Sequence, residues 1–214
     1  MEDESSQWMS IADVMSVLMM IFMFLSVAFI YQLQNSRETY KDELNTALHK
    51  EFDKDLERWI AEITPNNIFR FNAPFREGVS QLPHLYGETL SEFFPRYIKV
   101  LTSPRFVSEI DELRIEGHTS YGWSHIATRN EIYLKNMQLS QSRASAVLEF
   151  CYSLNHVLIN DKKNWLEAHL RSNGMAYSNL ILQSGDVAKT FSSHEANEQD
   201  ETRSRRVEFN VVVK

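Results

Sequence analysis

The chain has 214 residues, of which 24% are charged, and its formal net charge is −7. A nucleic-acid partner is not expected, because phosphate binding needs a clustered basic face. Cys151 is the only cysteine, so no internal disulfide can form, and we expect it to be a small buried apolar residue on a helix.

The first predicted element is an apolar run of 21 residues, 11–31. As a helix it would span roughly 30 Å, the thickness of the hydrocarbon core of a bilayer. The short tail, residues 1–10, has no Lys or Arg, and the run exceeds the h-region of a typical signal peptide. We therefore predict one uncleaved transmembrane helix, although Ser26–Ala28 loosely imitates a cleavage site.

Asp13 lies just inside this apolar run. An ionised acid in hydrocarbon costs roughly 2.5 to 3.5 kcal/mol, so such a residue is usually functional. Ser16 shares its helix face and has two possible partners, the Asp13 carboxyl group and its own backbone. An alternative is that Ser10 and Asp13 form a capping box, in which the acid only satisfies backbone amides at a helix start.

Residues 32–64 are predicted to form an amphipathic linker helix without Gly or Pro before Pro65 ends it. Its apolar stripe recurs every three to four positions and comprises Tyr40, Leu44, Leu48, Phe52, Leu56, Ile60 and Ile63. Two interpretations stay open. The stripe covers the protein's own domain, or it pairs with a second copy of the chain.

Residues 65–214 are predicted to form one α+β domain, since their length suits a single core. The patterns indicate strands at 68–71, 113–118, 179–182 and 206–213. They indicate helices at 89–101, with Pro95 in the first turns, at 134–154 and at 165–170.

Three separated motifs in this region resemble the pattern of OmpA-like peptidoglycan-binding domains. They are Ile115-Glu-Gly-His-Thr119, Asn136-Met-Gln-Leu-Ser-Gln-Ser-Arg-Ala144 and Arg205-Arg-Val-Glu208. The resemblance covers residues 68–214 and implies an α/β sandwich that binds the diaminopimelate of the cell wall. A surface ion pair of Arg143 with Glu131 or Glu149 is the structural alternative.

The OmpA-like resemblance implies a peptidoglycan site formed by Asn136, Leu139, Arg143, His118, Ser120 and Arg206. A guanidinium can bind a carboxylate with two parallel hydrogen bonds, which suits Arg143 to this ligand. Ser120 replaces the family's Asp, so the counter-ion for the ligand's ammonium group is lost. Of Arg205 and Arg206, one is expected to be structural.

The apolar run resembles the transmembrane segment of flagellar MotB stator proteins through Ala12-Asp13-Val-Met-Ser16. That resemblance implies that Asp13, with Ser16 beside it, carries a translocated H⁺ or Na⁺. It also implies an inner-membrane location with the N-terminus cytoplasmic and the domain periplasmic. Lys and Arg next to a membrane helix usually stay in the cytoplasm. This rule alone predicts the opposite orientation, because Arg37, Lys41 and Lys50 all follow the run.

The short acidic tail, the single helical linker and the altered Gly-His-Thr-Asp motif together resemble ZorB subunits of the Zorya antiphage defence system. This resemblance implies a homodimer, bound to peptidoglycan and surrounded by a pentameric multipass partner, ZorA. Alternatives are a flagellar MotB subunit and a passive wall tether without ion flow.

An enzyme is not expected, because the sequence has no P-loop and no Gly-x-Ser-x-Gly motif. No cofactor or metal is expected either, since the seven His and one Cys show no metal-ligand spacing.

Overall fold

The computed structural model describes residues 2–72, 75–123, 128–188 and 192–214, with side chains from Asp13 onward except at Ser193. The chain forms two compact units, Met1–Glu43 and Leu44–Lys214.

The first unit is the N-terminal part of one continuous helix, α1 (Glu2–Leu56). Its apolar side chains from Val14 to Ile30 are exposed, as expected for a segment that contacts lipid. Within the described residues this is the one helix long and apolar enough to cross a membrane. The predicted helix at 11–31 is confirmed.

The C-terminal end of α1 belongs to the second unit, because Leu44, Leu48 and Phe52 are fully buried there. For this part of the stripe, the interpretation that it covers its own domain is correct. The prediction that the helix continues to residue 64 is wrong, since α1 ends at Leu56 and Ala61–Ile63 form strand β1. Ile60 takes a left-handed backbone (φ 51°), which turns the chain into that strand. The compact unit therefore starts before the expected boundary at residue 65.

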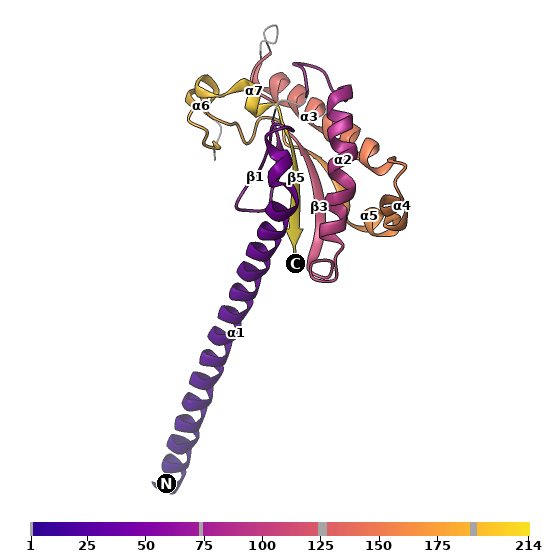
Figure 1. Ribbon diagram of the computed structural model, residues 1–214. Coiled ribbons are helices and arrows are strands. Elements are labelled where there is room, and N and C mark those ends of the chain that lie inside the picture. The colour runs from indigo at the N-terminus through magenta and orange to yellow at the C-terminus, as the bar shows by residue number, and fades with distance from the viewer. Residues whose placement is uncertain (1, 73–74, 124–127, 189–191) are drawn as a thin grey trace. The chain divides into compact units, whose positions relative to one another are not determined.

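A five-stranded sheet in the order β1-β2-β5-β3-β4 forms the centre of the second unit (Figure 1). Strands β2 (Phe69–Phe71), β3 (Ile110–Gly117) and β5 (Val207–Val213) confirm three predicted strands. Strand β4 (Leu170–Gly174), which pairs in parallel with β3, was not expected. The strand predicted at 179–182 is wrong, because Ile181 and Leu182 make only isolated bridges.

The helices are α2 (His84–Leu101), α3 (Arg129–Tyr152), α4 (Val157–Asp161), α5 (Lys163–His169), α6 (Ser193–Glu198) and α7 (Glu201–Ser204). Helix α2 begins earlier than predicted, so Pro95 lies in its interior and not in its first turns. The helices predicted at 134–154 and 165–170 are confirmed as α3 and α5, and the short α4, α6 and α7 were not expected.

Helices α2 and α3 cover the same face of the sheet. Phe209 of β5 contacts Phe93 of α2, with ring centroids 5.1 Å apart, and Gly117 of β3 lies against α3. Since Ile115 pairs with Phe209 and Gly117 with Val207, these residues point to one side. Phe69 of β2 and Phe52 of α1 complete the aromatic core, which leaves the polar residues of β2, β3 and β5 on the opposite face.

Candidate functional site: a pocket around a buried arginine

The candidate binding site lies where strand β3 ends beside helix α3. A Cβ added at Gly117 would lie 2.2 Å from the carbonyl oxygen of Ser140, and one at Gly174 would lie 2.7 Å from the backbone nitrogen of Gln141. Only glycine fits at such close approach. The two glycines therefore let α3 rest directly on the strand ends, which brings Arg143 next to the loop that follows β3.

The guanidinium of Arg143 is fully buried and bonds to backbone carbonyls. Nε donates to Val79 at 2.9 Å, Nη2 donates to Arg76 at 2.8 Å, and Nη1 donates to His118 at 3.4 Å. A guanidinium has five N–H groups, so two of them make no hydrogen bond to the described residues. One such donor remains on each terminal nitrogen.

The positive charge of Arg143 has no carboxylate partner among the described residues. Burial, and then the nearby charge of Arg205, lower the pKa of Arg143 from 12.5 to about 10, so the group still carries its proton at neutral pH. The expected alternative, a surface ion pair with Glu131 or Glu149, is wrong. A buried cation without a counter-ion is costly, and an anionic ligand would relieve that cost.

A small cavity of about 20 Å³ lies against Arg143. It is lined by Ser120, Asn136, Leu139 and Arg143, as predicted, and also by Glu77, Gly78, Thr119, Gly122, Trp123 and Arg205. This volume holds about one water molecule. A larger ligand group would therefore have to displace part of the lining.

Three residues that line this cavity carry a buried polar side-chain atom that makes no hydrogen bond to the described residues. The atoms are Oγ1 of Thr119, Nδ2 of Asn136 and Nε of Arg205. Asn136 is held in place at its other end, where Oδ1 accepts a 3.2 Å hydrogen bond from Nε1 of Trp123. Buried polar groups in proteins nearly always have partners, so these atoms are available to a ligand or to water.

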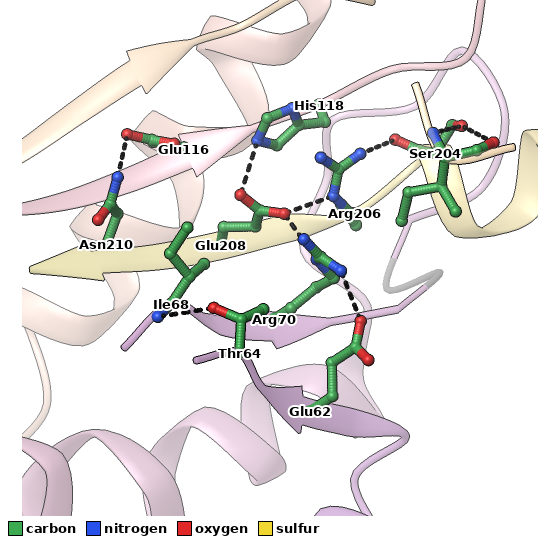
Figure 2. A network of polar contacts seen from close by, with 11 residues as sticks. Glu62, Thr64, Ile68, Arg70, Glu116, His118, Ser204, Arg206, Glu208 and Asn210 are labelled. Atoms are coloured by element: carbon green, nitrogen blue, oxygen red, sulfur yellow. Dashed lines mark hydrogen bonds and ion pairs between the residues drawn. The ribbon is translucent and has the colours of Figure 1, made fainter. Parts of the chain in front are cut away.

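The side chains of His118 and Arg206 do not line the cavity, so the prediction that they form part of its surface is wrong. Figure 2 shows both directed toward Glu208 instead. Nε of Arg206 donates to Glu208 at 2.6 Å, and Nε2 of His118 lies 3.4 Å from the other carboxylate oxygen. His118 contributes to the site only through its backbone carbonyl, which accepts from Arg143.

Glu208 is the centre of a ladder of buried charges (Figure 2). The ladder lies on the face of the sheet opposite α2 and α3. It also accepts from Nε of Arg70 at 2.7 Å, and Arg70 in turn pairs with Glu62 at 2.7 Å. Burial opposes ionisation, but His118 and the two guanidinium groups hold the pKa of Glu208 well below its usual range. The ladder ties β1, β2 and β5 together.

Glu116, His118 and Glu208 lie close enough together to resemble a metal site, since their ligand atoms fall within 4.8 Å of one another. Two observations disfavour a cation there. The guanidinium groups of Arg70 and Arg206 already neutralise Glu208, and Glu116 accepts a hydrogen bond from Asn210 at 3.1 Å. We interpret the cluster as a structural network.

Asp13 and Ser16 lie well inside α1, which begins at Glu2. Eleven residues of helix precede Asp13, or about 16 Å at the usual rise. A capping box formed by Ser10 and Asp13 is therefore wrong, because that role requires the first turn of a helix. The Asp13 side chain is exposed, on the apolar segment of the helix.

The sequence interpretation missed Glu77 and Thr119 as pocket residues. Thr119 belongs to the Gly-His-Thr motif, so its place could have been inferred from the motif. Glu77 lies in a loop without periodicity, and no local pattern indicates the direction of its side chain.

No family model matches this sequence. Among curated proteins, the chain is 33% identical over 225 residues to the Zorya protein ZorB of Escherichia coli (strain Crooks), which covers 99% of this chain and 89% of that protein.

Among solved structures, a putative MotB-like protein from Desulfovibrio vulgaris has a TM-score of 0.47 at 15% identity and covers 81% of this chain and 96% of its own. The cell wall anchor of the type VI secretion system (T6SS) from Pseudomonas aeruginosa has a TM-score of 0.46 at 16% identity, covering 78% and 97%. Because the identity to the Escherichia coli protein extends over nearly the whole of both chains, this chain belongs to the ZorB family.

Proposed function

We propose that this chain is a non-enzymatic stator subunit of an ion-driven motor in the bacterial inner membrane, acting in antiphage defence. Its second unit binds peptidoglycan, and its apolar helix carries the translocated ion on Asp13. The observation that carries the proposal is that one chain combines an acid in a membrane-length helix with a buried cation, lining a pocket, that has no counter-ion among the described residues.

The wall anchor rests on the Arg143 pocket. Two N–H groups of the guanidinium and one donor each on Asn136 and Arg205 have no partner in the part of the chain that the structure describes, and together they form a set of donors suited to a carboxylate. The stem peptides of peptidoglycan are rich in carboxylates, and the family resemblance names diaminopimelate as the group that is bound.

Ion transport rests on Asp13. Burial against a partner raises the pKa of a carboxyl group and contact with water restores it, so alternating exposure loads and unloads a proton or exchanges Na⁺. Each charge that crosses the membrane releases roughly 2.3 kcal/mol per 100 mV. A single helix cannot enclose a pathway, so the proposal requires a multipass partner of the ZorA kind around a dimer of this chain, with Ser16 close to the ion.

A stator transmits force only if its wall-binding unit lies on the side of the membrane that carries the wall. The proposal therefore places the N-terminus in the cytoplasm and Leu44–Lys214 in the periplasm. Large domains cross the membrane largely regardless of charge, so the basic residues after the helix do not oppose this orientation.

The test compares two variants with two measurements: phage plating on cells that carry the complete defence system, and co-sedimentation of the full-length chain with purified cell-wall sacculi. Asp13→Asn should keep wall binding and lose protection by at least about 100-fold in plating efficiency. Arg143→Lys, which keeps the charge but loses the planar fork, should weaken wall binding at least about tenfold, equivalent to 1.4 kcal/mol.

Arg171→Lys is the matched control, because Arg171 also bonds only to backbone carbonyls, those of Glu167, Ala168 and Leu170, but does not line the pocket. It should leave both measurements unchanged. If Asp13→Asn protects as well as the unmodified chain, the chain is a passive tether and not part of a motor. If the unmodified chain does not bind sacculi, the wall anchor is wrong.

A further inference from the structure

Glu77 is an exposed carboxylate that lines the Arg143 pocket, and no motif indicated it. Its position is fixed by the arginine itself, because Arg143 bonds to the carbonyl of Arg76 on one side of Glu77 and to that of Val79 on the other. Gly78 has a left-handed backbone (φ +67°), which allows the tight turn after Glu77. The loop therefore holds an acid at the pocket rim.

The charges of the pocket are separated. Arg143 and Arg205 supply two cations, and Glu77 is the one carboxylate among the described lining residues. Among the described residues the Glu77 side chain has no ion-pair or hydrogen-bond partner, and Ser120 and Thr119 offer only neutral hydroxyl groups. The pocket thus presents donors for a carboxylate at its base and one acceptor for a cation at its rim.

We infer that Glu77 is a specificity-determining residue that recognises the ammonium group of a zwitterionic ligand while Arg143 and Arg205 bind its carboxylate. This inference rests on the proposed wall-binding function and adds to it. In this arrangement Glu77 supplies the negative charge that Ser120 cannot, from a different segment of the chain. An ammonium at an exposed rim is partly screened by solvent, so its loss should weaken binding about three- to tenfold.

The experiment measures how well two soluble competitors release the full-length chain, in detergent, from diaminopimelate-containing sacculi. The competitors are meso-2,6-diaminopimelate and pimelate, which share the same seven-carbon dicarboxylate and differ in the two ammonium groups. The unmodified chain should be released by diaminopimelate at a concentration at least about threefold lower than by pimelate. The reason is that the Glu77 carboxylate can form a charge-assisted hydrogen bond with an ammonium group, which pimelate lacks.

In Glu77→Gln, which keeps the shape and removes the charge, the two competitors should become equally effective. Adding Ser120→Asp to this variant should restore the preference, because it returns a carboxylate to the same pocket. Glu149→Gln is the control: Glu149 is exposed on α3, does not line the pocket, and its loss should change nothing.

If Glu77→Gln still prefers diaminopimelate as strongly as the unmodified chain, the role of Glu77 is wrong while wall binding stands. If the unmodified chain prefers neither competitor, the inference is likewise overturned. If the unmodified chain does not bind sacculi at all, the proposed function fails first and the inference fails with it. The competitor ratio separates recognition from folding, since a merely destabilised variant would bind less but discriminate equally.

Discussion

Neighbouring arginines in this chain serve two different purposes. Arg206 is almost fully buried and pairs with Glu208, whereas the Nε of Arg205, a residue that lines the Arg143 pocket, is buried with no hydrogen-bond partner among the described residues. The sequence motif predicts that one of the pair is structural but cannot tell which, because the outcome depends on where β5 begins. Since β5 starts at Val207, Glu208 points to the face of the sheet opposite α2 and α3. Arg206 precedes Glu208 by two positions, so its side chain points to the same face.

Arg206→Ala and Arg205→Ala should separate these purposes. Removing Arg206 leaves Glu208 with one fewer guanidinium in a buried position, so the free energy of unfolding should fall by roughly 3 kcal/mol or more. Removing Arg205, whose pair with Glu201 is long at 3.6 Å, should cost less than about 1 kcal/mol but weaken binding to sacculi. Thermal melting and co-sedimentation of the two variants give the comparison. Equal losses of stability would contradict the assignment.

His118 should make the fold sensitive to mild acid. Burial, and then the charge of Arg206, lower its pKa from 6.5 to about 4, so the folded chain keeps His118 neutral where the unfolded chain protonates it. The free energy of unfolding therefore keeps its full value above pH 6.5. It falls as the pH drops toward 4, by about 3 kcal/mol at most, because the unfolded chain binds the proton more readily. The neighbouring Glu116, whose pKa burial raises, acts in the opposite direction.

The measurement is the melting temperature between pH 7 and pH 4 for the unmodified chain and for His118→Gln. The variant keeps Glu116 and all other acids, so the difference between the two curves isolates His118. A smaller slope in the variant is expected. Identical slopes would show that His118 titrates as it does in the unfolded chain.

Among the helices and strands, the strongly periodic segments could be predicted from the sequence, whereas the short strand β4 and the end of α1 could not. The alternation of Val207, Phe209 and Val211 indicated β5, and these residues are indeed buried. Strand β4 was missed because it follows α5 without a break and has one apolar residue, Leu170, to mark it. The end of α1 was missed because its stripe continues to Ile63, while tertiary pairing of β1 with β2 overrides that pattern.

The aromatic core predicts where a soluble fragment must begin. Phe52 of α1 contacts Phe69, Phe93 and Tyr97, with ring centroids 5.3, 5.4 and 6.4 Å away. A fragment of residues 44–214 should therefore fold cooperatively, and a fragment of residues 65–214 should be destabilised by more than about 3 kcal/mol, the usual cost of removing a buried aromatic side chain. Chemical denaturation of both fragments tests this. Equal stability would mean that α1 is not part of the core.

For the molecule as a whole, composition and hydropathy predicted an apolar helix of membrane length followed by one α+β domain, and the structure contains such a helix and such a domain. The fold and the pocket could be predicted because each of their signals lies within one short stretch of sequence. These signals are the apolar run of membrane length, the alternation of the strands and the motif around Arg143. The position of Glu77 at the pocket could not be predicted, because the direction of its loop depends on contacts between residues more than 60 positions apart, such as Arg143 with Val79.

Ion movement that depends on Asp13 can be measured with fluorescent reporters of cytoplasmic H⁺ and Na⁺ in infected cells that carry the complete system with a multipass partner. The unmodified chain should produce a rise in one of the two ions after infection, and Asp13→Asn should abolish it while the protein still binds sacculi. An equal rise in Asp13→Asn cells, or protection by the unmodified chain with neither ion moving, would contradict the account.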